Sequence, residues 1–158
     1  MKNQGKVFEN EWKASKPDGV LLERLNDGSA SWSNGNNTRF QAKNPCDYIM
    51  FDGERLYYLE LKSTNGKSLP LGNIKKNQVD GLNERSIYYN VRCGFVVKFK
   101  DVEKCFYMSI KQYNDFVAYN TRKSIPLDYF ENRCIEVEMK KKVVNFTYNI
   151  KKMIKEIK

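Results

Sequence analysis

The feature that most constrains the fold is the stretch DYIMFDGERLYYLELKS, residues 47–63, which combines two apolar runs with a turn signal. Asp52-Gly53 separates the runs, and an Asp-Gly pair between apolar segments is typical of a two-residue β-hairpin turn. The many Tyr, Leu and Ile residues indicate a hairpin that is mostly buried. A buried strand normally excludes charge, yet this one carries several charged side chains. They include Asp47, Glu60 and Lys62.

A two-residue turn in this hairpin places Asp47 opposite Tyr58. Side chains alternate along a strand, so Tyr58, Glu60 and Lys62 share one face, and Asp47 lies on that face as well. Asp47 and Glu60 are then diagonal neighbours, about 7–8 Å apart at the backbone. The spacing therefore predicts two carboxylates and one ammonium group on a single patch of the sheet.

Two buried carboxylates side by side repel each other and lose hydration, unless a cation neutralises them. Mg²⁺ suits such a pair, with Mn²⁺ as the alternative, because it takes one or two carboxylates and keeps its other positions for water and phosphate oxygens. The chemistry that fits is phosphodiester hydrolysis, in which Lys62 stabilises charge in the transition state. Two other interpretations stay open: Glu60 and Lys62 form a simple ion pair, or Asp47 is a turn residue. Asp52 is assigned to the turn and not to catalysis.

Charge and composition narrow the class of protein. The 158 residues include 28 Lys and Arg and 19 Asp and Glu, a net charge of +9, which favours a polyanionic partner such as nucleic acid, with solubility as the alternative. The absence of histidine excludes every His-based mechanism, and the four cysteines form no CxxC pair that would indicate zinc. No apolar run is long enough to span a membrane, and the polar N-terminal stretch is unlike a signal peptide. A cytoplasmic protein without a membrane partner is therefore expected.

The order of predicted elements indicates one domain over residues 1–158. Helices are predicted at about residues 2–15, 74–90, 111–119 and 149–158. Strands are predicted at about residues 20–25, in the hairpin, at 91–99 and 104–110, and in the runs CIEVEM and VVNFTY after residue 133. A Gly/Ser/Asn-rich flexible loop is expected at about residues 26–44, and a second loop at 66–72. Strands interspersed with helices predict an α/β protein with a mixed β-sheet flanked by helices.

The pattern Asp47, then Glu60-Leu61-Lys62, resembles the PD-(D/E)xK nuclease superfamily. More closely, the chain is similar to the RecU-type Holliday junction resolvases of Gram-positive bacteria and their phages. Three further stretches carry this resemblance. They are Gly5-Lys6-Val7-Phe8-Glu9, Ser68-Leu69-Pro70-Leu71-Gly72-Asn73-Ile74 followed by Gln78, and Arg122-Lys123-Ser124-Ile125. The resemblance implies a restriction-endonuclease-like fold.

The resemblance also implies roles for individual residues. Asp47 and Glu60 would be metal ligands and Lys62 the catalytic lysine. Glu9 would be a helix carboxylate that joins the site, although helical periodicity places Glu11 nearer the apolar face of the same helix. Gln78 would be a helix residue that faces the site. Independently of the resemblance, the loop cations Arg39, Lys43 and Lys67 are candidates for phosphate contacts, with simple solvation as the alternative.

The chain departs from the family where the resolvases have a stalk-like insertion, because residues 26–44 are shorter. The expected function is a Mg²⁺-dependent endonuclease that resolves four-way DNA junctions by paired symmetric nicks. Two nicks need two active sites, so a homodimer is expected. The alternatives are a restriction- or repair-type nuclease on duplex DNA and a DNA-binding module without catalytic activity.

Overall fold

The computed structural model describes residues 3–26 and 44–158. The main sheet of this part has six strands in the order β1-β2-β3-β5-β6-β8. They are β1 (Leu21–Arg24), β2 (Tyr48–Phe51), β3 (Leu56–Thr64), β5 (Val91–Phe99), β6 (Lys104–Ser109) and β8 (Ile135–Glu136). Two small antiparallel sheets pair β4 (Ser68–Pro70) with β7 (Ser124–Pro126), and β9 (Met139–Lys141) with β10 (Phe146–Tyr148).

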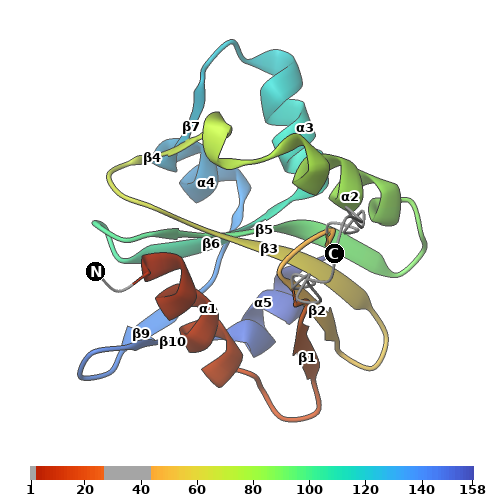
Figure 1. The fold of residues 1–158 in the computed structure, drawn as a ribbon, viewed down its shortest axis with the longest axis vertical. Helices are drawn as coiled ribbons and strands as arrows, with labels where there is room; N and C mark the ends of the chain where they lie inside the picture. The colour runs from red at the N-terminus through yellow and green to blue at the C-terminus, as the bar shows by residue number, and fades with distance from the viewer. Residues whose placement is uncertain (1–2, 27–43) are drawn as a thin grey trace, which may run out of the picture.

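Helices cover both faces of the main sheet (Figure 1). They are α1 (Gln4–Ala14), α2 (Lys76–Ser86), α3 (Ile110–Tyr119), α4 (Leu127–Arg133) and α5 (Ile150–Glu156), with a short 3-10 helix η1 (Leu71–Asn73). The predicted class, a mixed α/β sheet flanked by helices, is confirmed. Among the described residues, no helix is both long and apolar enough to cross a membrane.

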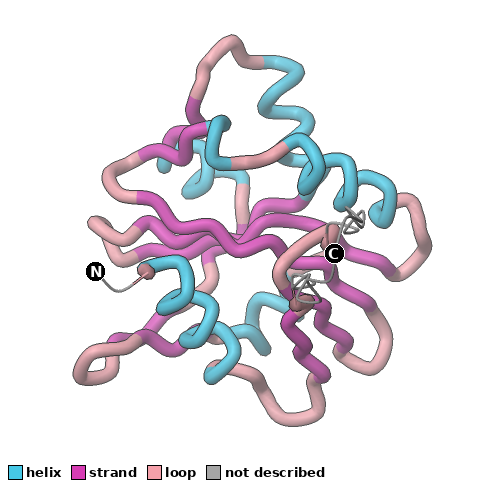
Figure 2. The backbone as a smooth tube through the Cα atoms, in the orientation of Figure 1, coloured by secondary structure: helices cyan, strands magenta, loops and turns pink. Residues whose placement is uncertain are grey.

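Each face of the sheet has its own core. One core contains α1, α5 and β10, and it receives Tyr57, Leu59 and Leu61 from β3. The other core contains α2, α3 and α4, and Tyr58 packs against it. Figure 2 shows the strands of the sheet passing between these two groups of helices. Alternate side chains of β3 therefore enter opposite cores, as the period of a strand requires.

The pairing of β3 changes along its length. It runs parallel to β5 from Leu56 to Thr64, but its antiparallel pairing with β2 ends where Tyr48 lies opposite Leu59. From Glu60 onward, β3 has a neighbouring strand on one side only. The backbone amides on the other side need different acceptors, because buried amide groups are rarely left without a hydrogen bond.

The predicted two-residue turn of the β2–β3 hairpin is wrong. The loop has four residues, because Asp52 Oδ1 accepts hydrogen bonds from the amides of Glu54 (2.9 Å) and Arg55 (2.7 Å) and holds both outside the strand. Tyr58 consequently lies opposite Ile49 and not opposite Asp47. A shift of two residues leaves every side chain on the face that the sequence predicts. The prediction that Asp52 is a turn residue is confirmed.

Other elements differ from prediction in the connections. The predicted loop at residues 66–72 contains β4 and most of η1, and β7 and α4 are not among the elements that the sequence predicts. β4 and β7 pair across more than 50 residues of chain, and such a distant partner leaves no local periodicity to detect. Nearly all of the predicted loop at residues 26–44, including Arg39 and Lys43, lies outside the described residues.

Candidate active site

Asp47 lies directly before β2, at the point where β3 loses its second neighbour. Its Oδ2 accepts a hydrogen bond from the backbone amide of Leu61 at 2.8 Å, so the carboxylate takes the place of the missing strand. Continuing the observed register by one residue puts Asp47 beside Glu60. The turn interpretation of Asp47 is therefore too simple, because its side chain binds the backbone of the strand that carries Glu60 and Lys62.

Glu60, Lys62 and Gln78 form a closed set of hydrogen bonds between β3 and α2. Lys62 Nζ lies 2.9 Å from Glu60 Oε1 and donates to Gln78 Oε1 at 3.0 Å. The amide Nε2 of Gln78 donates to the same Glu60 oxygen at 2.5 Å. Gln78 Oε1 also accepts from the backbone amide of Lys75 at 3.0 Å, at the first turn of α2. The helix terminus thus fixes the orientation of the amide that holds Lys62 and Glu60.

The charged side chains of the site are largely buried. The side chain of Glu60 is 4% exposed, and burial, reinforced by the charge of Asp47, raises the pKa of Glu60 to about 7. Burial also raises the pKa of Asp47, although the hydrogen bond from Leu61 opposes this. Lys62 lowers the pKa of both carboxyls. The site therefore has more negative charge than its one lysine neutralises, which is the condition that favours a bound cation.

The structure distinguishes the two glutamates of α1. Glu9 forms an ion pair with Arg24 of β1 at 2.6 Å, and its charge raises the pKa of both Asp47 and Glu60. Glu11 belongs to the other side of the helix, where its Oε2 lies 2.8 Å from Lys98 Nζ in a buried ion pair. The resemblance implies Glu9 at the site, and the geometry places Glu9 and not Glu11 near the other carboxylates.

The donor set fits a hard divalent cation. In the described ranges, no three acidic, cysteine or histidine side chains form a metal site by themselves. Asp47 and Glu60 offer two carboxylates, the number with which Mg²⁺ binds when water and phosphate complete its shell. The Lys62 ammonium group already lies beside Glu60 Oε1 and neutralises part of its negative charge. The simple ion pair that the sequence left open is present, and it engages Glu60 Oε1, the oxygen that also accepts from Gln78.

The remaining candidates lie apart from this constellation. Lys67 is exposed in the turn between β3 and β4, and its ammonium group makes no contact that assigns it to the site. Sequence reasoning missed Arg24, which pairs with Glu9 and lowers the pKa of Asp47. Only the folded sheet brings these residues together, since Arg24 lies fifteen positions after its partner. No periodic signal links the two.

Comparison with known families identifies the chain. A family model described as recombination protein U (RecU) matches residues 24–152, which include β2, β3 and α2. The chain belongs to the RecU family. The match spans four of the five residues predicted for the site: Asp47, Glu60, Lys62 and Gln78. Glu9 lies before the first matched residue.

Individual relatives align with most of the chain. An uncharacterized protein derived from the SPbeta prophage of Bacillus subtilis (strain 168), YotM, is 31% identical over 174 residues, covering 98% of this chain and 87% of YotM. The Holliday junction resolvase RecU of Ureaplasma parvum serovar 3 is 28% identical over 121 residues, covering 76% of this chain and 68% of that protein. Among solved structures, the Holliday junction resolvase Hjc of Archaeoglobus fulgidus aligns with a TM-score of 0.49 and 15% identity, covering 84% of this chain and 92% of Hjc.

Proposed function

We propose that this RecU family member is a Mg²⁺-dependent endonuclease that resolves four-way DNA junctions by paired symmetric nicks. The observation that carries the proposal is the buried set formed by Asp47, Glu60, Lys62 and Gln78, in which burial raises the pKa of Glu60 to about 7. A set of charges this costly to bury is typical of a functional site. The family to which the chain belongs supplies the substrate class.

Each residue of the site has a distinct task. Asp47 and Glu60 would hold Mg²⁺, which supplies positive charge for a phosphoryl oxygen and a bound water of lowered pKa. Lys62 Nζ lies 2.9 Å from Glu60, so a phosphate oxygen placed beside Glu60 is within its reach. The ammonium group then stabilises the negative charge that develops in the transition state. Gln78 holds Lys62 in this position from the first turn of α2.

Glu9 shapes the charge of the site without direct contact to Glu60. Its carboxylate is neutralised in part by Arg24 at 2.6 Å. The remaining negative charge raises the pKa of Asp47 and of Glu60, which increases the affinity of the pair for a cation. Paired nicks on a four-way junction need two such sites, and a homodimer with two-fold symmetry provides them.

The test compares a labelled immobile four-way junction with a linear duplex of matched sequence, each with Mg²⁺, with Mn²⁺ or with EDTA. We expect symmetric nicks confined to the junction and dependent on the metal. Asp47→Asn should lower the cleavage rate about 100-fold or more, because even changes behind metal ligands cost about 10–100-fold. Asp52→Asn, a turn residue on the same hairpin, is the matched control and should keep its activity.

The outcomes separate the proposal from its alternatives. Equal cutting of junction and duplex would assign the chain to duplex DNA nucleases of the same superfamily. Binding without cutting under any metal would leave a DNA-binding module. Substantial cleavage by Asp47→Asn would remove this carboxylate from the catalytic set. Sedimentation of the protein with and without the junction tests the homodimer directly.

A further inference from the structure

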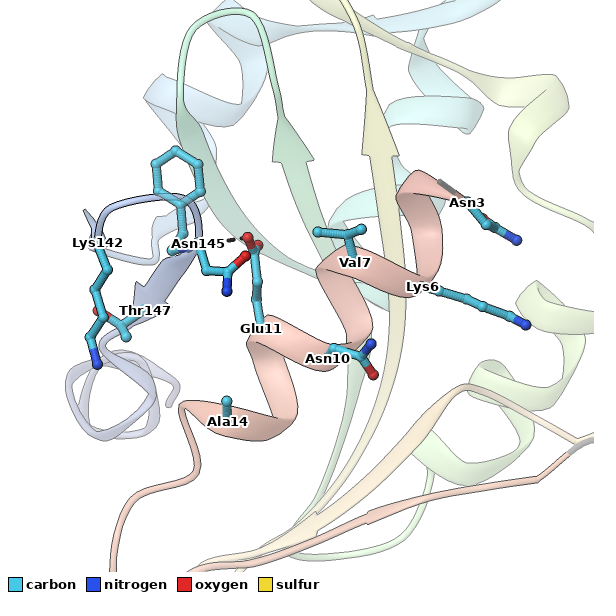
Figure 3. A pocket seen from close by; sticks show the side chains of 10 residues that line it. Asn3, Lys6, Val7, Asn10, Glu11, Ala14, Lys142, Asn145 and Thr147 are labelled. Atoms are coloured by element: carbon cyan, nitrogen blue, oxygen red, sulfur yellow. Dashed lines mark hydrogen bonds between the residues drawn. The ribbon is translucent and has the colours of Figure 1, made fainter. Parts of the chain in front are cut away.

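A second surface of the molecule combines unpaired positive charge with exposed apolar side chains. An open groove of about 620 Å³ runs between α1 and the β9–β10 hairpin. Figure 3 shows Glu11 directed from α1 toward the hairpin, whereas Lys6 and Asn10 point away from it along the outer side of the helix. Lys142 lines the groove from the hairpin side. The site described above uses none of these groups.

The charge of this groove is positive. Glu11 is the one acidic residue in its lining, and that carboxylate is already bound to Lys98 at 2.8 Å and to the Tyr148 hydroxyl at 2.9 Å. Lys6 and Lys142 are exposed, and within residues 3–26 and 44–158 neither makes an ion pair. An anionic ligand therefore meets the ammonium group of Lys142 in the groove, that of Lys6 on the outer side of α1, and no free carboxylate in the groove lining.

The tip of the hairpin is apolar and projects into solvent. Val143 is 97% exposed and Val144 is 75% exposed, within the four-residue loop that joins β9 to β10. Turns ordinarily contain Gly, Asn or Asp, so two adjacent valines have no evident local role here. Lysines precede them directly in the sequence, at positions 140–142. Proteins that bind the minor groove of DNA combine cationic side chains with apolar side chains that contact the bases.

The base of the hairpin is anchored to α1 and to Lys98. The amide of Phe146 donates to Glu11 Oε1 at 3.1 Å, and Lys98 Nζ lies 4.3 Å from the centre of the Phe146 ring. These contacts connect β10 to α1, the helix that carries Glu9. Lys6 lies three residues before Glu9, and residues three apart are neighbours on a helix surface. The outer side of α1 thus leads from the hairpin toward the candidate active site.

We propose that this groove and hairpin bind an arm of the DNA substrate. Lys142 contacts phosphates at the hairpin, Lys6 contacts phosphates along the outer side of α1, and Val143 and Val144 rest against sugars and base edges. The proposal deepens the proposed function, on which it rests, by assigning the surface that grips duplex DNA outside the site of cleavage. It assigns no part of the chemistry to these four residues.

The test measures binding of a labelled four-way junction and a linear duplex by fluorescence anisotropy, in EDTA, over a range of NaCl concentrations. The double variant Lys6→Ala/Lys142→Ala should flatten the slope of log affinity against log salt by about 1.8, since each phosphate contact contributes about 0.9. At about 0.1 M salt this corresponds to up to ~60-fold weaker binding. The matched control is Arg122→Ala/Lys123→Ala, because both side chains are exposed and neither makes an ion pair within the described residues. It removes two charges near α3 and β7, away from α1 and the hairpin (Figure 1).

A second variant separates apolar contact from charge. Val143→Ser/Val144→Ser should weaken binding severalfold while leaving the salt slope unchanged, because the slope reports phosphate contacts alone. All four altered side chains are exposed, so the melting temperature should stay at the wild-type value. The proposed DNA-binding role of the groove is refuted if the groove variant and its control variant lose equal amounts of DNA affinity. It is also refuted if both groove variants bind DNA as tightly as wild type.

The same data distinguish a failure of the groove from a failure of the proposed function. If wild type cuts the junction and the groove variants bind normally, the function stands and the groove is wrong. If wild type never cuts but its binding depends on Lys6 and Lys142, the groove stands and the nuclease assignment is wrong. If wild type binds no DNA, both are wrong.

Discussion

The buried carboxyl of Glu60 makes the stability of this protein depend on pH and on metal. Its side chain is 4% exposed, and burial together with the charge of Asp47 raises its pKa to about 7. In the unfolded chain the carboxyl ionises near its ordinary value of 4.5. Between these two pH values the folded protein holds a proton that the unfolded chain has lost. The contribution of Glu60 to stability therefore falls as the pH rises from about 4.5 to about 7.

The size of the effect follows from the two pKa values. A folded-state pKa of about 7 against 4.5 corresponds to about 3 kcal/mol of unfolding free energy, lost across this pH range. The pKa of Asp47 is raised for the same principal reason, so its contribution has the same sign. A loss of this size is a large share of the total stability of a small domain, which is commonly about 5–15 kcal/mol.

The assay is urea denaturation in EDTA at several values between pH 5 and pH 8. Wild type should lose stability with increasing pH, and Glu60→Gln should lose about 3 kcal/mol less over the same range because its amide does not ionise. The exposed turn residue provides the matched control, Glu54→Gln, which should follow wild type. Taking the difference between variants removes the contributions of other groups.

Bound Mg²⁺ should restore the stability that the folded protein loses when Glu60 ionises. At pH 8, Mg²⁺ at ten times its dissociation constant should stabilise wild type by about 1.4 kcal/mol, because ligand that binds only the folded state adds RT ln(1 + [L]/Kd). Glu60→Gln should gain much less. The reasoning is refuted if wild type and Glu60→Gln show the same pH dependence in EDTA. It is also refuted if Mg²⁺ stabilises both proteins equally, since the carboxylate would then hold no cation.

Two further predictions concern lysines on neighbouring strands. Lys62→Ala should lower the rate of junction cleavage about 10²–10³-fold with little change in Mg²⁺ affinity measured by calorimetry, because its role lies in the transition state; a collapse of Mg²⁺ affinity would favour a structural ion pair instead. Lys98→Met should destabilise the protein by about 3–5 kcal/mol in urea denaturation, since it leaves the buried Glu11 carboxylate without its partner. Adding Glu11→Gln to Lys98→Met should recover part of that loss, and no recovery would contradict the pairing.

The sequence predicts the face of each hairpin residue but not the register. The Asp-Gly pair correctly marks the turn, and alternation correctly places Glu60 and Lys62 on one face. The loop length depends on the Asp52 carboxylate, which accepts hydrogen bonds from two backbone amides, those of Glu54 and Arg55. Such a choice between turn types has no periodic signal. The predicted grouping of the site residues is unaffected by the wrong register, because a shift of two residues does not exchange the faces of a strand.

The contacts that complete the site could not be predicted from periodicity. The resemblance alone implies a role for Gln78. Its task depends on how α2 begins beside β3, where the Gln78 amide contacts Lys62, Glu60 and the backbone of Lys75. β7 and α4 were missed for different reasons. β7 has a partner far away in sequence, whereas α4 follows Pro126 and buries Leu127 and Phe130, an i, i+3 spacing that is present in the sequence.

The two glutamates of α1 show how one helix serves both surfaces. Each residue of an α-helix is rotated by about 100° about the axis, so residues two apart differ by about 200°. Glu9 and Glu11 therefore face nearly opposite sides of α1. Glu9 pairs with Arg24 beside the candidate active site, and Glu11 binds Lys98 and the backbone of the β9–β10 hairpin. The anchor on one side therefore sets the position of the carboxylate on the other. Weakening that anchor should disturb DNA binding and cleavage together, whereas charge removal in the groove should disturb binding alone.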